Sequence, residues 1–323
     1  MKISTFFESF LKKESIFVDK SILSSTYFPE EVPYREEQIQ EVANVLAPSL
    51  RLERPSNLFL FGKTGTGKTL TVKHILRSMA EIAKNNNIAW KSIYVNCKLK
   101  KVADTEYRLI AQLIKELGQD IPPTGLPTDE VYNVFYKLLD QSKQIILLVL
   151  DEIDQLTKKM GDDIFYNLTR INSELKNSQI CIIGISNNLT FCECLDPRVK
   201  SSLSEEELIF PPYNALQIQD ILKKRSQKAF KENVIQPGVV EKCAAFAARD
   251  HGDARRAIDL LRVAGELAER SGSATIEITH LDEAEMKIES DTVLNTVASQ
   301  PKQFQCVLYA IILISPQKKI FFT

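Results

Sequence analysis

The sequence has no long hydrophobic run. Its longest candidate, Val307–Ile314, is far shorter than the roughly 18 apolar residues that a membrane-spanning helix needs. Charged residues from Lys2 to Asp19 interrupt every apolar stretch near the N-terminus, so no signal-peptide core can be drawn there. Net charge is also nearly absent, because 41 Lys and Arg stand against 42 Asp and Glu and leave −1. We therefore expect a soluble, cytoplasmic protein without membrane contact, whose contacts with any nucleic acid are local.

Cysteine and histidine are too scattered to indicate a metal site. The six cysteines include no CxxC pair, and none of the three histidines lies near two cysteines. We interpret the thiols as buried or idle groups in a reducing compartment rather than as zinc ligands. Glycine and proline are few as well, at 11 and 13 residues, and with 26% charged residues the composition excludes collagen-like and disordered chains.

Strands and helices alternate over the first two thirds of the chain, whose length of 323 residues favours about two domains. Five short aliphatic or β-branched runs are predicted to be strands: Asn57–Phe61, Ser92–Asn96, Ile145–Leu150, Ile180–Ile185 and Glu207–Phe210. The segments between them keep a helical period, which predicts an α/β fold with a mostly parallel five-stranded sheet covered on both sides.

A change of pattern follows Pro211 and Pro212. Beyond them the apolar positions keep a helical period and β runs nearly vanish, which predicts a separate all-α unit. Its expected helices are Ala215–Phe230, Pro237–Ala248, Ala254–Arg270 and Leu281–Ile288.

A glycine-rich loop follows the first predicted strand and precedes an amphipathic helix. It has the pattern GxxxxGKT, whose backbone N–H groups turn inward on phosphates while the lysine and the threonine serve the β/γ-phosphates and Mg²⁺. We therefore predict binding of ATP with Mg²⁺ by a set of loop residues: Gly62, Thr64, Gly65, Thr66, Gly67, Lys68, Thr69 and Leu70.

Two carboxylates end the predicted strand Ile145–Leu150. Burying Asp151 and Glu152 at that place without a cation would be costly. We expect Asp151, with Thr69, to hold Mg²⁺, and Glu152 to orient and polarise the attacking water. The order of these motifs, with an extra strand between them, resembles the AAA+ division of P-loop ATPases.

Two further residues match AAA+ sensor positions. Asn187 follows the strand Ile180–Ile185, where a polar residue senses the γ-phosphate in AAA+ proteins. Arg255 opens a helix in the second unit, although a helix N-terminus favours acidic residues, so an anionic partner is indicated. By the same resemblance Arg255 reaches the γ-phosphate from a lid domain.

Longer stretches resemble the archaeal replication-initiator family, which is related to the eukaryotic origin recognition complex and its helicase-loading partner. The matching stretches are the leader Ser24–Arg35, LDEID, GISNN, DPRVKSSLSEEE, FPPY and GDARRAIDLLR, within a likeness that covers residues 15–310 or so. The resemblance implies an ATPase with slow, switch-like hydrolysis that binds double-stranded origin DNA and helps to load the replicative helicase. It also implies self-association, or association with a paralogue, on DNA.

The resemblance assigns more residues. Tyr34, Arg35, Tyr213 and Arg225 would line the nucleotide pocket, and Arg198 matches a region from which AAA+ proteins present an arginine to a neighbour's ATP. At Ser202 many relatives carry arginine instead. Whether Arg198 acts on the ATP of a neighbouring subunit is therefore left open.

An insertion follows the second predicted strand. A helix over Asp104–Gly118 and the loop Gln119–Pro127 correspond to the family's DNA-contacting element. The candidate contacts are Arg108, Thr124, Gly125, Leu126, Lys98, Lys100 and Lys101.

The expected division is an AAA+ core with leader (1–211), a helical lid (212–290) and an incomplete winged-helix segment (291–323). A linker is expected from Asp291, followed by the opening helix of a winged-helix domain that is truncated relative to the family. Three alternatives remain: a clamp-loader or junction-helicase relative, a protein unfoldase, and a nucleotide-gated binding module with negligible turnover.

Overall fold

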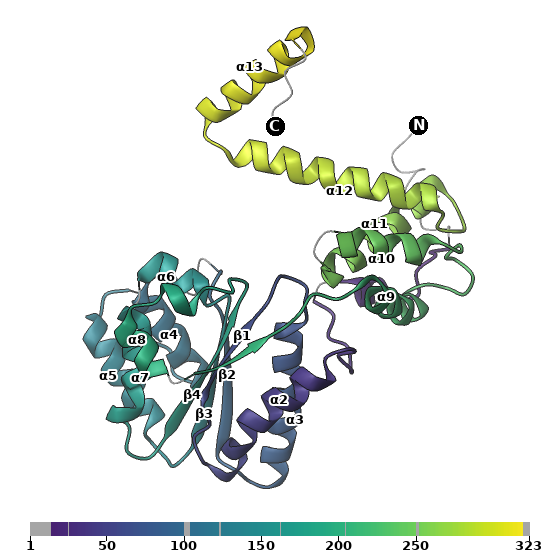
Figure 1. Ribbon diagram of the computed structural model, residues 1–323. Coiled ribbons are helices and arrows are strands. Elements are labelled where there is room, and N and C mark those ends of the chain that lie inside the picture. The colour runs from purple at the N-terminus through teal and green to yellow at the C-terminus, as the bar shows by residue number, and fades with distance from the viewer. Residues whose placement is uncertain are drawn as a thin grey trace. The chain divides into compact units, whose positions relative to one another are not determined.

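The computed structural model describes residues 14–24, 26–99, 104–122, 124–161, 163–203, 205–249 and 252–318. The described chain forms two compact units (Figure 1). The first, here called the α/β unit, comprises Phe28–Gln217 and the short segment up to Ala254. The second, the helical unit, comprises the residues up to Tyr27, Ile218–Arg249 and those from Arg255 onward. The candidate DNA contacts Lys100 and Lys101 lie outside the described residues.

A five-stranded parallel sheet forms the centre of the α/β unit, as the alternating pattern predicted. Its strand order is β2-β3-β4-β1-β5. Every residue of β1 and β3 is buried, and both are apolar in the sequence except for Asn57 at the start of β1 and Asp151 at the end of β3. The strands are β1 (Asn57–Phe61), β2 (Trp90–Asn96), β3 (Ile145–Asp151), β4 (Gln179–Ser186) and β5 (Glu205–Ile209).

Helices cover both faces of this sheet (Figure 1). Successive residues of a strand point to opposite faces, so Leu58 and Leu60 pack with α2 and α3, whereas Phe59 and Phe61 pack with the helices of the other face. On the first face lie α2 (Glu36–Leu46) and α3 (Lys68–Asn85), with the short helix η2 (Ala47–Arg51) following α2. On the second lie α4 (Glu106–Glu116), α5 (Thr128–Leu139), α6 (Asp154–Met160), α7 (Asp163–Glu174), η3 (Cys192–Cys194) and α8 (Pro197–Leu203).

The helical unit includes the described residues up to Tyr27, which we had expected to belong to the core. Phe17 pairs with Phe230 as an antiparallel bridge, and their ring centroids lie 4.7 Å apart. Gly265 makes this packing feasible, because a Cβ there would lie 2.7 Å from the Phe17 ring. The unit contains η1 (Lys20–Leu23), α10 (Val239–Arg249), α12 (Ile278–Ser299) and α13 (Lys302–Lys318), and all but the first residues of α9 (Ala215–Ala229) and α11 (Ala254–Ser271).

The linker expected from Asp291 is wrong. Helix α12 continues without a break through that position to Ser299, and α13 begins at Lys302. The physical reason is that α12 contains neither glycine nor proline, whereas Pro301 lacks the N–H that a continuing helix needs. The winged-helix assignment of 291–323 stays a prediction.

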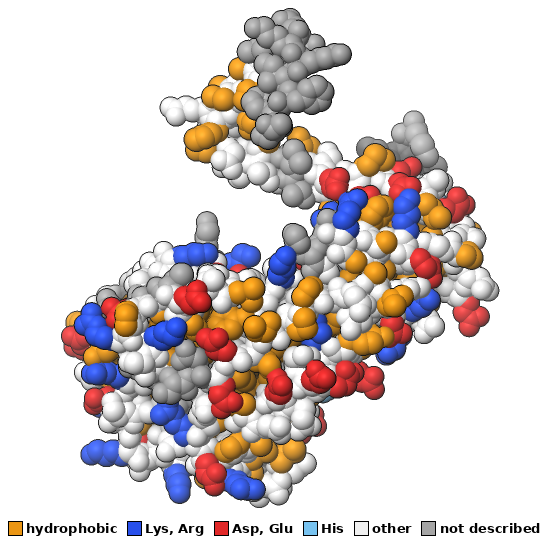
Figure 2. All heavy atoms as spheres, in the orientation of Figure 1, with side chains coloured by type: hydrophobic (Ala, Val, Ile, Leu, Met, Phe, Trp, Pro, Cys, Tyr) orange, Lys and Arg blue, Asp and Glu red, His pale blue; other side chains and the backbone are white. Residues whose placement is uncertain are grey.

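The distribution of surface charge and the hydropathy of the helices complete the description. On the face shown in Figure 2, basic and acidic side chains of the α/β unit are interspersed rather than gathered into one basic stripe. None of the helices described is both long and apolar enough to span a bilayer.

Candidate functional site

The glycine-rich loop connects β1 to α3 and needs its glycines. Gly65 and Gly67 have φ values of 71° and 93°, in the left-handed region that other residues rarely adopt. A side chain at Gly67 would also lie 2.8 Å from the hydroxyl of Tyr213. The loop therefore brings its backbone to the N-terminus of α3, where unpaired N–H groups and the helix dipole favour an anion.

Lys68 is held at the centre of this loop. Although it is a lysine, it is only 5% exposed. Its Nζ donates hydrogen bonds to the carbonyl oxygens of Gly62 (2.7 Å) and Lys63 (2.8 Å) and to Oδ1 of Asn187 (3.0 Å). A buried ammonium surrounded by neutral oxygens is suited to an anionic ligand, since only an anion would neutralise its charge. The structure thus brings together the predicted loop lysine and the predicted sensor asparagine.

Thr69 and Asp151 lie next to each other, as expected for a shared cation. The Thr69 hydroxyl donates to Oδ2 of Asp151 at 2.9 Å, and the Asp151 side chain is almost fully buried. Hydroxyl and carboxylate oxygens are the hard ligands that Mg²⁺ prefers, so the residues present fit that ion. Sequence reasoning missed a third partner, Tyr94, whose hydroxyl donates to the same Oδ2 at 2.5 Å. The available signal was its place on β2, the neighbour of β3.

Glu152 occupies a strained position directly after β3. Its φ is +55°, which is uncommon for a residue with a side chain and costs backbone energy. Its carboxylate is 22% exposed and lies 3.5 Å from Nζ of Lys98. The backbone N–H of Glu152 donates to Oδ1 of Asp151 at 2.9 Å, which fixes the turn. Lys98, a candidate DNA contact, is therefore also an ion-pair partner of the proposed catalytic carboxylate.

Arg35 supports the loop through its guanidinium, and its predicted place in the nucleotide pocket stays a prediction. It is 2% exposed, and burial lowers the pKa of its guanidinium. It donates to the carbonyl oxygens of Thr66 (2.9 Å), Tyr34 (2.8 Å) and Pro211 (2.6 Å). The guanidinium carbon also lies 3.8 Å from the ring centroid of Tyr213, a stacking distance. The two residues therefore join the leader, the loop and the end of the sheet, while Tyr34 itself has a positive φ of 60° and is half-exposed.

We expect Arg35→Ala to lower the free energy of unfolding of the α/β unit by about 2–4 kcal/mol, because one buried and two partly buried carbonyls lose a charged donor. Arg35→Lys should recover only part of this, since one ammonium cannot replace a planar fork. Urea unfolding followed by circular dichroism measures the change. Arg51→Ala, at an exposed arginine of the same unit, is the control and should change stability by less than about 0.5 kcal/mol. Equal effects at both positions would contradict the supporting role of Arg35.

Asp253 is a loop contact that sequence reasoning missed. Its Oδ2 accepts a hydrogen bond from the Thr64 hydroxyl at 3.2 Å, and a Cβ on Gly65 would overlap its carboxylate. The motif GDARR was interpreted through its arginine alone, although an aspartate directly before a helix is typical of an N-cap. A carboxylate at this place disfavours phosphate by like-charge repulsion, so phosphate binding and this contact oppose each other.

The remaining predicted residues lie apart from this cluster or in the other unit. Arg198, on α8, is 83% exposed and lies 3.3 Å from Asp196. Arg225 and Arg255 belong to the helical unit, so their relation to the loop stays a prediction. Within that unit Arg225 donates to the carbonyl oxygen of Ile22 at 2.6 Å and stacks on Tyr27 at 4.5 Å, which attaches the leader to α9.

The insertion forms the expected helix α4, which begins with Thr105 as its N-cap. Arg108 lies 3.7 Å from Asp104 and keeps 45% of its side chain exposed. The loop residues Thr124–Leu126 contain Gly125 with a φ of 110°, a conformation that favours glycine. Their expected DNA contacts stay predictions.

Comparison with known proteins gives consistent similarities in both units. The AAA domain family matches residues 51–190, and the Cdc6 AAA+ ATPase-type lid domain matches residues 219–286. The chain is 49% identical over 316 residues to the ORC1-type DNA replication protein of Thermococcus onnurineus, covering 97% of this chain and 75% of that protein.

Solved structures agree with these similarities. The Aeropyrum pernix ORC1 protein, solved in complex with DNA, is 44% identical with a TM-score of 0.84 over 95% of this chain and 78% of that one. Cdc6p from Pyrobaculum aerophilum is 26% identical with a TM-score of 0.73 over 84% of this chain and 72% of that one. Together the comparisons confirm the expected AAA+ fold with a lid domain.

Proposed function

The chain belongs to the family of ORC1-type DNA replication proteins, and on that premise we propose that it is a cytoplasmic ATPase switch that binds double-stranded origin DNA and helps to load the replicative helicase. The observation that carries the ATPase part is the cluster at the end of the sheet. It joins a buried Lys68, bonded to loop carbonyls and to Asn187, with the Thr69–Asp151 pair. The 44% identity to a protein solved with DNA supports the DNA-binding part.

In this proposal the loop residues 62–70 hold the phosphates of ATP through backbone N–H groups, and Lys68 supplies the charge. Thr69 and Asp151 would hold Mg²⁺, which would supply positive charge to the phosphate groups. Glu152 orients and polarises a water molecule, and Asn187 fixes the position of Lys68 near the γ-phosphate. The Lys98–Glu152 ion pair competes with the water for the carboxylate, which favours slow hydrolysis.

The DNA contact is assigned to the insertion, through Arg108 and the loop Thr124–Leu126. The exposed guanidinium of Arg108 and the backbone of a glycine-containing loop are groups that contact DNA phosphates. On the face shown in Figure 2 the charges of the α/β unit are interspersed, which favours local contacts over a broad basic surface on that face. Arg198 would act on the ATP of a neighbouring copy or paralogue on DNA.

A single-turnover ATPase assay with and without duplex DNA tests the proposal. We expect slow hydrolysis, and an ATP affinity that changes by at least about threefold when duplex is added, because binding at two linked sites is reciprocal. Hydrolysis that is unaffected by duplex, together with equal DNA affinity in ATP and ADP, would contradict an ATP-controlled DNA switch. No hydrolysis at all, with nucleotide-dependent DNA binding, would favour the alternative of a gated binding module.

We further expect Arg255→Ala to weaken ATP binding more than ADP binding. The proposed partner of this arginine, the γ-phosphate, exists only in ATP. The ratio of ATP affinity to ADP affinity should therefore fall, by up to about tenfold, which is the contribution expected of one exposed charged hydrogen bond. Calorimetry with each nucleotide measures the ratio, and Arg256→Ala in the same helix is the matched control. An equal loss for both nucleotides would assign Arg255 to the shared phosphates or to a structural role.

A further inference from the structure

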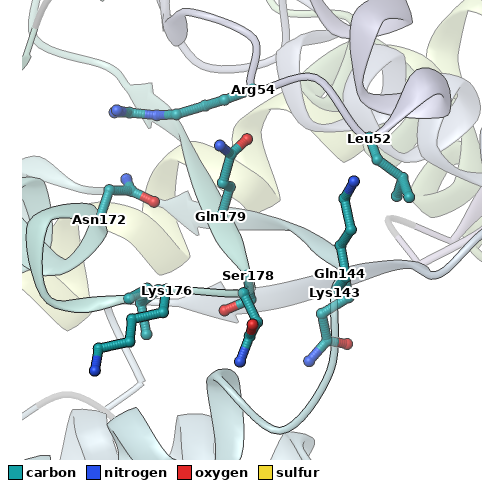
Figure 3. A pocket seen from close by; sticks show the side chains of 10 residues that line it. Leu52, Arg54, Lys143, Gln144, Asn172, Lys176, Ser178 and Gln179 are labelled. Carbon is teal, nitrogen blue, oxygen red and sulfur yellow. The ribbon is translucent and has the colours of Figure 1, made fainter.

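A polar hollow lies at the amino ends of the central strands, whereas the phosphate loop follows the carboxyl end of β1. Its volume is about 470 Å³. Its walls come from the segments that precede three neighbouring strands, β1, β3 and β4, together with the end of α7 (Figure 3). The loop of the nucleotide site follows β1 at its carboxyl end, so the length of the strand, on the order of 15 Å, separates the two places. The lining residues are Leu52, Arg54, Lys143, Gln144, Asn172 and Leu175 to Gln179.

The walls of the hollow are fixed by hydrogen bonds to the backbone. The Asn172 side chain donates to the carbonyl oxygen of Ile180 at 2.9 Å and accepts from its N–H at 2.7 Å. Its amide therefore pairs with the backbone of β4 as a residue of a neighbouring strand would. Asp140 accepts hydrogen bonds from the N–H groups of Lys176, Asn177 and Ser178, which lowers the pKa of its carboxyl. These contacts shape the segment before β4 and leave its side chains at the rim.

The donors that remain are cationic or neutral. Arg54, Lys143 and Lys176 bring positive charge from three different segments, and no carboxylate lines the hollow. Within the described ranges, the side chains of these three residues and of Gln179 make no hydrogen bond or ion pair with the protein. In the view of Figure 3, Lys143 and Lys176 lie on opposite sides of Ser178. Asp140 offsets part of this charge, but its oxygens face the backbone N–H groups just described.

Ser178 gives an independent indication of a ligand. It is 2% exposed, and its hydroxyl has no hydrogen-bond partner among the described residues. Buried hydroxyls in folded proteins nearly always have a partner, so this one needs an explanation. Ser178 lines the hollow, and a change of its side-chain rotamer would bring this closed-off hydroxyl to an oxyanion bound there, which would supply the acceptor.

We propose that this hollow is a second anion site that binds a phosphate group, distinct from the nucleotide site. Three cations that approach from different segments, with a hydroxyl and an amide, match the tetrahedral oxygens of phosphate better than the planar pair of a carboxylate. The volume exceeds one phosphate, so the group belongs either to a small phosphorylated molecule or to the backbone of DNA. The hollow has no aromatic residue for stacking, which disfavours an unpaired base as the main contact.

The first test measures phosphate binding in the full chain carrying Lys68→Ala, so that the nucleotide loop does not contribute. Lys143→Gln with Lys176→Gln removes two cations from the hollow, and Lys84→Gln with Lys228→Gln removes two exposed lysines elsewhere as the matched control. Inorganic phosphate, compared with chloride at equal ionic strength, should raise the Tm of the control, because a ligand that binds only the folded state stabilises it. We expect the double variant at the hollow to bind phosphate at least tenfold more weakly.

A second arm identifies the source of the phosphate group. The same two double variants are made in the chain that keeps Lys68, and each is saturated with ATP. Their binding of a short duplex of random sequence is then measured. A loss of duplex affinity with a slope of log K against log salt that is shallower by about 2 assigns the hollow to DNA backbone. A loss for inorganic phosphate alone assigns it to a small phosphorylated ligand. The proposal is overturned if the two double variants bind phosphate equally and bind the duplex equally. The phosphate measurement is independent of the proposed function, because it does not require that DNA binding depends on ATP.

Ser178→Ala distinguishes a ligand-binding role of the Ser178 hydroxyl from a purely structural one, through the Tm measured with and without phosphate. We expect an unchanged or higher Tm without phosphate, because an unpartnered hydroxyl is removed, together with a smaller rise when phosphate is added. A lower Tm with the full response to phosphate would overturn the donor set proposed for the hollow.

Discussion

Replacement of Lys68 by alanine is expected to weaken ATP binding by at least about 100-fold, or about 2.7 kcal/mol. The ammonium is the buried charge at the centre of the loop, and its bonds to the carbonyl oxygens of Gly62 and Lys63 place it where phosphate oxygens would lie. The loop and helix α3 should survive, since alanine favours a helix. Titration with a fluorescent ATP analogue measures the loss.

Lys84→Ala serves as the control for this change, because it removes an exposed lysine from the last turn of the same helix. Its ATP affinity should stay within about threefold of the unsubstituted chain, under about 0.7 kcal/mol. If Lys68→Ala also stays within that range while remaining folded, the loop is not the nucleotide site.

Glu152→Gln is expected to slow ATP hydrolysis at least about tenfold, a barrier increase of about 1.4 kcal/mol or more, while ATP affinity changes by less than about threefold. The amide keeps the size of the side chain and one acceptor oxygen but cannot act as a base toward water. The strained backbone at this position is unchanged by the substitution, so folding should be kept. Single-turnover hydrolysis and equilibrium binding separate the two effects.

Lys98→Ala is the matched variant for this prediction. It removes the ion pair at 3.5 Å yet leaves the carboxylate, so hydrolysis should be equal or faster. A rate that falls in Lys98→Ala as much as in Glu152→Gln would mean that the pair, and not the carboxylate, is required. An unchanged rate in Glu152→Gln would remove this residue from the reaction.

The sequence predicted the sheet and the loop well because both depend on local patterns. β1 has the predicted bounds, Asn57–Phe61, since an aliphatic and aromatic run directly before the glycine-rich loop leaves little ambiguity. The loop follows a fixed spacing of glycines and a lysine. Contacts between distant segments were harder: Tyr94 reaches Asp151 across neighbouring strands, and Asp253 reaches Thr64 from far along the chain. No local period records such contacts.

The helical unit shows the same limit in another form. A helical period predicts that a segment is helical, but it does not say where one helix ends, so the continuation of α12 beyond Asp291 was missed. The packing of Phe17 on Phe230 depends on space left by Gly265, which a pattern of apolar residues cannot show. The roles of Arg225 and Arg255 in nucleotide binding stay predictions for a related reason, because they depend on the other unit.

The strand order also sets when a nascent chain can first bind nucleotide. β1 leaves the ribosome early, but it pairs only with β4 and β5, which begin at Gln179 and Glu205. At translation rates of about 5–20 residues per second, the wait is on the order of ten seconds. During that time the apolar segment Asn57–Phe61 has no sheet to join and is a natural binding site for a chaperone. Chains arrested before Ile209 should therefore carry the whole glycine-rich loop and yet fail to retain ATP on the ribosome.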